Sequence, residues 1–335
     1  QFSEGFLRCV FNVQTPRLVL NAMAKACWDP LNHGRDSDIY VGLQEQLAEL
    51  DRGPLSAVRA LWRQVSQLNE QKRQLTAELC SLLARLNRTH RVRDYVSCGD
   101  HGKLVLSLRR ALDSESECDS DTPGRTWVVH DQHSDDIPAV LERGSLEPVG
   151  QQVTIDYGCV GAVHAVPSCS ADLFTMCQGL HHLPLDQLQP FLAFVLRVLR
   201  PGGLFVLREH DATPELIPLL DLAHSVFNAA TGVSPRDERH EIRAFRPLSE
   251  WRLLLESAGF RNTMLYAAQE NDVTLDVMLC FEKPPLASAA LRRRTPGAQL
   301  DAPTLASVGA GGISTLVSDP TLVSDPTLVS DPTLV

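Results

Sequence analysis

The sequence predicts an α/β protein built on a mostly parallel sheet, and residues 171–211 indicate this most clearly. An apolar strand at 172–177 is followed by an amphipathic helix, which the Pro-Gly-Gly turn at 201–203 ends, and then by a second apolar strand at 204–207. A strand, a crossover helix and a second strand build a parallel pair. Polar residues gather after both strands, at the edge where open α/β sheets bind ligands.

The other elements continue this alternation on both sides of the central unit. The strands expected before it are 95–98, 127–130 and 153–155, and the helices are 102–112 and 137–143. The helices expected after it are 216–227 and 250–258, the second capped by Ser249 and ended by Gly259, and the last strands are 263–267 and 273–281. The final strand is expected to run antiparallel to the others.

The N-terminal region, residues 1–90, is expected to be helical and to cap the site. Leu18–Trp28 has a helical pattern, and Pro54 opens the longest helix, whose apolar stripe continues to Leu86. The heptad pattern breaks in the polar middle of that helix, so packing on a globular body is favoured over a coiled coil. Residues 285–335 lose the periodicity and carry three copies of TLVSDP, which predicts a disordered tail.

The composition excludes several classes of protein. The chain has 335 residues, of which 44% are hydrophobic, so it can bury a sizeable core. Its net charge of −10 disfavours nucleic acid as a partner, because phosphate contacts need clustered basic residues. A membrane span is not expected, because no apolar run reaches about 18 residues. Nine cysteines without a CxxC pair indicate reduced thiols and a cytoplasmic location.

Residues 91–284 resemble the S-adenosylmethionine-dependent methyltransferases with a Rossmann-like fold. The resemblance rests on the segment Leu-His-His-Leu-Pro after the fourth strand and on Leu-Arg-Pro-Gly-Gly before the fifth. It is closest to members that act on small molecules. It implies a three-layer sandwich with a seven-stranded, mostly parallel sheet, S-adenosylmethionine as the cofactor and a small-molecule substrate. The acceptor atom and the oligomeric state stay open.

The resemblance also implies which residues contact the cofactor. They are Ser97, Gly99 and Gly102 in the first turn, Asp131 after the second strand, Asp156 after the third, and Gln178, Gly179 and Leu180 after the fourth. Asp131 would accept hydrogen bonds from the ribose hydroxyls, and the glycines would let the backbone approach the ligand. The first turn departs from the family: Ser97 replaces a glycine, one extra residue precedes Gly102, and Asp94 lies one position early.

Four side chains after the fourth and fifth strands are candidates for acid–base chemistry: His181, His182, Glu209 and His210. A histidine titrates near neutrality, which suits the removal of a proton from a nucleophile. Packing roles for the histidines and an ion pair between Arg208 and Asp211 are the alternatives. A metal site is not expected, since the side chains of adjacent residues diverge in direction.

Two other functions remain open at this point. A related fold that has lost the cofactor and serves as a binding module is indicated by Ser97, by the extra loop residue and by the displaced Asp94. A dinucleotide-dependent oxidoreductase would have a similar sheet. The Pro-Gly-Gly turn and the antiparallel last strand disfavour this third function.

Overall fold

The structure is a computed structural model, and it describes most of the chain between residues 36 and 285. The described ranges are 36–49, 56–115, 124–131, 137–156, 164–177, 179–231, 233–268 and 274–285. All of them belong to one compact unit. Of the acidic loop expected at 113–121, residues 113–115 are helical and the rest lies outside the described residues. The helix expected at 18–28, Gln178 and the TLVSDP repeats also lie outside them.

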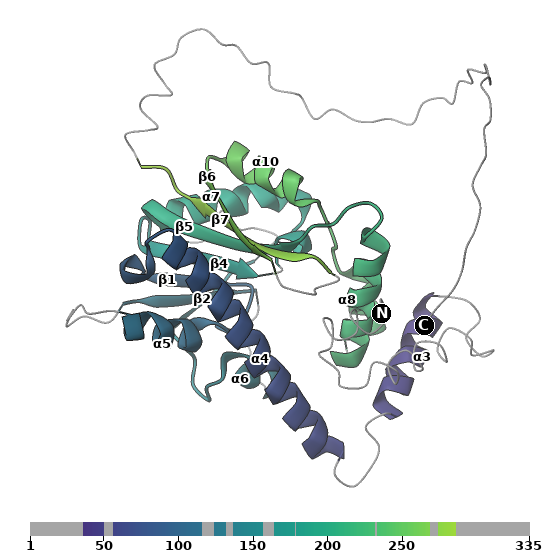
Figure 1. Ribbon diagram of the computed structural model, residues 1–335. Helices are drawn as coiled ribbons and strands as arrows, with labels where there is room; N and C mark the ends of the chain where they lie inside the picture. The colour runs from purple at the N-terminus through teal and green to yellow at the C-terminus, as the bar shows by residue number, and fades with distance from the viewer. Residues whose placement is uncertain are drawn as a thin grey trace, which may run out of the picture. The chain divides into compact units, whose positions relative to one another are not determined.

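Seven strands form one sheet in the order β3-β2-β1-β4-β5-β7-β6 (Figure 1). They are β1 (Tyr95–Cys98), β2 (Thr126–His130), β3 (Gln151–Thr154), β4 (Ala171–Cys177), β5 (Leu199–His210), β6 (Arg261–Ala268) and β7 (Asp276–Glu282). The pairs from β3 to β5 are parallel, and β7 is antiparallel to both β5 and β6. The predicted α/β fold, a mostly parallel sheet with an antiparallel last strand, is confirmed.

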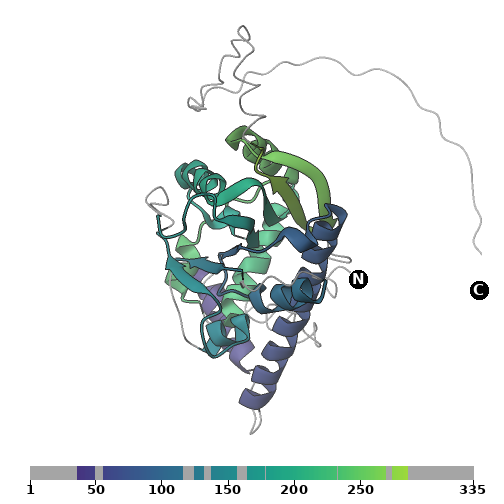
Figure 2. The ribbon, with the colours of Figure 1, turned by 90° about the vertical axis from the view of Figure 1, so that its left-hand side faces the viewer.

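Helices cover both faces of the sheet, which explains why the central strands bury apolar side chains on both faces (Figures 1 and 2). The helices are α3 (Asp36–Glu49), α4 (Ser56–Arg85), α5 (Val105–Glu115), α6 (Ile137–Arg143), α7 (Leu188–Val198), α8 (Ile217–Thr231), α9 (Pro235–His240) and α10 (Leu248–Ala258). On one face Phe174 of β4 packs edge-on against Phe191 and Phe194 of α7. On the other face Leu173 of the same strand joins the core formed by α4 and α5.

The long helix α4 is part of the layer that covers the sheet. Its C-terminal half buries four leucines among β1, β5, β7 and α5: Leu75, Leu79, Leu82 and Leu83. The helix therefore packs on a globular body, as its apolar pattern favoured. The shorter helix α3 packs against α8, and Tyr40 and Gln44 both donate hydrogen bonds to the carbonyl of Val233, at 3.0 and 2.8 Å.

Three boundaries differ from the sequence-based expectations. Helix α5 begins at Val105, because Gly102 has a φ of +85°, which no α-helix contains. The strand β5 begins at Leu199, directly after α7, so the Pro-Gly-Gly segment lies inside the strand. Ser249 lies within α10 and does not cap it. The carboxylate of Asp211 instead accepts the backbone N–H of Leu248, at 2.9 Å. Within the described ranges, no helix has both the length and the apolar composition that a membrane span requires.

A buried carboxylate joins three strands at the edge opposite the carboxyl ends. Asp94 directly precedes β1, forms ion pairs with Arg125 and Arg200, and accepts the backbone N–H of Arg125 at 2.8 Å. Arg200 also pairs with Asp172 in β4, at 2.5 Å. Burial alone would raise the pKa of Asp94, but the hydrogen bonds from Arg125 and Arg200 outweigh it and lower the pKa to about 2. Asp94 is therefore a structural residue of the sheet.

The substitution Asp94→Asn should destabilise the domain, because it removes the buried negative charge that pairs with Arg125 and Arg200. The expected loss is about 3 kcal/mol of unfolding free energy at pH 7, measured by urea denaturation. The stabilisation from the carboxylate is complete above its ordinary pKa of 3.8 and disappears as the pH falls towards 2, so the difference between the variants should shrink below pH 4. Glu147→Gln, at an exposed carboxylate, is the control. Equal stability of Asp94→Asn and wild type at pH 7 would contradict this role.

Candidate functional site

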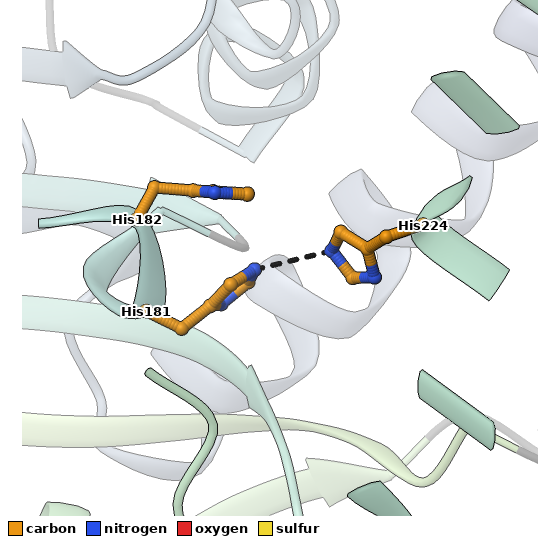
Figure 3. Close-up of side chains that lie close together, drawn as sticks. All are labelled: His181, His182 and His224. Atoms are coloured by element: carbon orange, nitrogen blue, oxygen red, sulfur yellow. Dashed lines mark hydrogen bonds between the residues drawn. The ribbon is translucent and has the colours of Figure 1, made fainter. Parts of the chain in front are cut away.

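Four histidines converge at the carboxyl ends of β4 and β5. His181 and His182 belong to a 3₁₀ turn, η3 (Leu180–His182), which follows β4. His210 ends β5, and His224 comes from α8. Figure 3 shows that the rings of His181 and His182 lie beside each other and that His224 faces them from the opposite side. Residues far apart in the sequence thus form one polar cluster.

Glu209 holds the turn η3 against the end of β5. Its side chain is 1% exposed. One carboxylate oxygen accepts the backbone N–H of Leu180 at 2.8 Å, and the other accepts Nδ1–H of His181 at 2.6 Å. A buried carboxylate needs such donors, since an unpaired charge away from water is strongly unfavourable. The contact also sets the orientation of the His181 ring, because it places the Nδ1 proton.

His224 and His182 are each tied to a backbone carbonyl. Nδ1 of His224 lies 3.0 Å from the carbonyl oxygen of Leu220, and Nδ1 of His182 lies 2.9 Å from that of Ile242. Nε2 of His224 lies 3.3 Å from Nε2 of His181. Burial, reinforced by the nearby His181, lowers the pKa of His224 to about 3 and also lowers the pKa of His182. Both rings are therefore neutral at physiological pH.

His210 forms a second carboxylate–histidine pair, with Asp276 on the neighbouring strand β7. Its Nδ1 lies 2.9 Å from Asp276 and 3.1 Å from the carbonyl oxygen of Thr274. Burial acts to lower the pKa of His210, but the Asp276 carboxylate outweighs it, and the pKa is raised above 6.5. Among the described residues, Nε2 of His210 has no hydrogen-bond partner. His210 is 5% exposed.

Asp276 also pairs with Arg208, at 3.2 Å. The alternative ion pair of Arg208 with Asp211 is therefore wrong, and Asp211 caps α10 instead. An apolar ring closes the cluster: Phe245 lies with its centroid 5.0 Å from the rings of His181 and His224. Its centroid lies 5.7 Å from that of His210.

The structure brings all four predicted acid–base candidates into one cluster, and it adds His224. The expectation that adjacent histidines diverge is wrong here: the rings of His181 and His182 have centroids 4.2 Å apart. His224 was missed because it is far from the others in sequence. One signal pointed to it. It lies four residues after the buried Leu220, near the apolar side of an otherwise hydrophobic helix.

The first turn after β1 carries two glycines in the left-handed region. Gly99 has a φ of +80° and is exposed, and Gly102 has a φ of +85°. A Cβ on Gly102 would lie 2.5 Å from a methyl group of Val149, so this position excludes a side chain. Asp100 turns inward, where it accepts hydrogen bonds from Ser97 Oγ at 2.8 Å and from the N–H of Gly102 at 2.9 Å. Burial raises the pKa of Asp100.

The other described residues assigned to a cofactor lie after β2, β3 and β4. Asp131 directly follows β2, Asp156 comes two residues after β3, and both are exposed. Gly179 lies between β4 and η3, and Leu180 is fully buried. A Cβ on Gly179 would lie 2.5 Å from the end of the Met176 side chain. These residues therefore lie at the carboxyl edge of the sheet.

Comparison with known proteins agrees with this architecture. Residues 131–207, from the end of β2 almost to the end of β5, match the family model described as a methyltransferase domain. The resemblance to S-adenosylmethionine-dependent methyltransferases with a Rossmann-like fold, inferred from the sequence, is thereby confirmed. No curated protein matches the sequence of the chain.

Several solved structures are distantly similar. Human N-acetylserotonin methyltransferase, in complex with SAM, is 17% identical with a TM-score of 0.42; the alignment covers 84% of this chain and 70% of that one. The pyocyanin biosynthetic protein PhzM is 18% identical with a TM-score of 0.47, over 84% of this chain and 73% of that one. The S-adenosylmethionine-dependent methyltransferase SibL, in its apo form, is 14% identical with a TM-score of 0.48, over 84% and 74%.

The substitution Asp276→Asn should lower the pKa of His210 below 6.5, because burial persists after the charge is removed. In the wild type the pair stabilises the fold below pH 6.5, and this stabilisation is lost as the pH rises through the raised pKa. An NMR titration of histidine-labelled, chelator-treated protein measures the midpoint. Asp186→Asn, at an exposed carboxylate, is the control. An unchanged His210 midpoint in Asp276→Asn would show that the pair does not set the pKa.

Proposed function

We propose that the chain transfers a methyl group from S-adenosylmethionine to a small molecule. One observation carries this proposal: the seven-stranded sheet has the strand order 3-2-1-4-5-7-6 with β7 antiparallel, and its segment 131–207 matches a methyltransferase domain. In open α/β sheets, ligands bind beyond the carboxyl ends of the strands. The residues assigned from the sequence lie at that edge.

The residues present fit such a cofactor at three points. The exposed Gly99 has no side chain to fill the space above the first turn. Asp131, exposed at the end of β2, would accept hydrogen bonds from the ribose hydroxyls, and Asp156 would contact the adenine. The backbone of Gly179 and Leu180 would line the other side of the cofactor. When bound, the sulfonium supplies an activated methyl group.

His210 is the residue that we assign to receive the proton of the acceptor. Nδ1 of His210 lies beside both the Asp276 carboxylate and the carbonyl oxygen of Thr274, and among the described residues its Nε2 has no hydrogen-bond partner. In its neutral form, with the proton on Nδ1, this histidine has a lone pair on Nε2 that can accept the proton of the acceptor. Glu209 and His181 position the turn η3, and Phe245 keeps water from the rings.

The proposed acceptor is a small molecule and not a nucleic acid. The net charge of −10 disfavours binding of a nucleic acid, because the phosphates of a nucleic acid are negatively charged. The N-terminal region would act as a cap on this side of the sheet, since its helix α3 packs against α8, which carries His224. A cap that excludes water favours alignment of donor and acceptor, which is the main demand of methyl transfer.

A binding module without catalysis is the second candidate, and one observation favours it. The carboxylate of Asp100 accepts the N–H of Gly102, so this donor in the first turn is satisfied by the chain itself. Ser97, which replaces a glycine, donates to the same carboxylate. A turn closed by its own side chains has less need of a ligand.

Isothermal titration calorimetry with S-adenosylhomocysteine separates the two candidates. The methyltransferase proposal predicts saturable binding with one site per chain. Asp131→Ala should weaken it about tenfold or more, because a charge-assisted hydrogen bond is lost. Asp186→Ala, at an exposed carboxylate on the η4 turn (Leu185–Gln187), is the matched control. Absence of binding at millimolar ligand would leave the binding module as the function.

A further inference from the structure

The three ring nitrogens that η3 and α8 bring together form an arrangement of metal-ligand type. One nitrogen from each of His181, His182 and His224 lies within 4.8 Å of the other two. Figure 3 shows the rings converging on one small region from the two elements.

The hydrogen bonds of the three rings leave their lone pairs on the converging side. Nδ1 of His181 faces the carboxylate of Glu209 at 2.6 Å, and Nδ1 of His182 and of His224 face backbone carbonyl oxygens at 2.9 and 3.0 Å. Carboxylate and carbonyl oxygens only accept, so each Nδ1 carries the proton. With the proton on Nδ1, Nε2 is the ring atom that offers a lone pair to a metal ion. This is the usual condition of histidines that bind a metal through one nitrogen.

The spacing of one pair of nitrogens matches tetrahedral coordination. Nε2 of His181 and Nε2 of His224 are 3.3 Å apart. Two imidazole nitrogens bound to zinc at 2.0–2.1 Å in tetrahedral geometry are separated by roughly 3.3–3.4 Å. A hydrogen bond between these two atoms would satisfy only that pair, whereas a single cation would satisfy all three lone pairs.

The surroundings supply the negative charge that a divalent cation requires. Glu209 backs His181 directly, which is the carboxylate–histidine–metal arrangement, and Glu241 lies 3.7 Å from His182. Among the described residues, the group of possible ligand atoms consists of three histidines and contains no cysteine or aspartate. Imidazole ligands alone suit zinc and its neighbours better than magnesium or calcium.

We propose that His181, His182 and His224 bind one divalent transition-metal ion of the zinc type. Glu209 positions His181 for this role. Three protein ligands leave one coordination position for water or another small ligand. The site does not depend on methyl transfer, because none of its ligands belongs to the residues assigned to the cofactor.

Metal analysis of the full chain tests the proposal. Protein carrying a tag free of histidine is purified, dialysed against a metal-scavenging resin, and measured by inductively coupled plasma mass spectrometry. The expected content is about one zinc per chain. His224→Ala and His182→Ala should each lose most of it, and the control His164→Ala, at an exposed histidine outside the cluster, should keep it. Circular dichroism verifies that each variant is folded.

A cobalt titration of the metal-stripped wild type gives a readout that does not depend on the variants. Tetrahedral visible absorption bands that saturate at one equivalent support the site, and Glu209→Gln should weaken cobalt binding 10- to 100-fold. Metal that is retained equally by His224→Ala and wild type is adventitious and overturns the proposal. A wild type that contains no zinc and shows no cobalt bands also overturns the proposal. In that case the rings share a proton. Calorimetry with S-adenosylhomocysteine on the same samples scores the methyltransferase proposal separately.

Discussion

The carboxylate of Glu209 is the interaction on which the rest of the site depends. Glu209 is the second-last residue of β5, where its side chain is shielded from water, so both of its oxygens must be satisfied. The chain meets this demand with the backbone of Leu180 and the ring of His181. The turn after β4 is thereby held against β5, and the direction of the His181 ring is set. Removing one partner of such a buried pair typically destabilises a protein by about 3–5 kcal/mol.

A carboxylate–histidine pair occurs on each of two adjacent strands, with different consequences. Glu209 holds His181, whose remaining nitrogen meets His224. Asp276, which lies opposite His210 in the antiparallel pairing of β5 and β7, holds His210, whose remaining nitrogen has no partner among the described residues. One histidine is thus built into a cluster and the other is left available for chemistry. Phe245 contacts both rings and separates them from solvent.

The sequence predicted the sheet better than it predicted the site, and the reason is physical. The apolar runs of β4 and α7 have a local periodicity, so their positions could be read directly. The partner of His181 in α8 is 43 residues away, and no local pattern records that distance. Asp211 was expected among the ionisable groups of the site, but it caps α10, because it meets the N–H of Leu248 only after folding. The contacts of side chains at the ends of strands are determined by the topology of the fold.

The position of one proton tests the central role of Glu209 most directly. Nitrogen-15 NMR of histidine-labelled, metal-free protein distinguishes the protonated ring nitrogen of His181 from the bare one. The account predicts a proton on Nδ1, strongly deshielded by the Glu209 carboxylate and slow to exchange because the ring is buried. A His181 ring with its proton on Nε2 and a bare Nδ1 would contradict it.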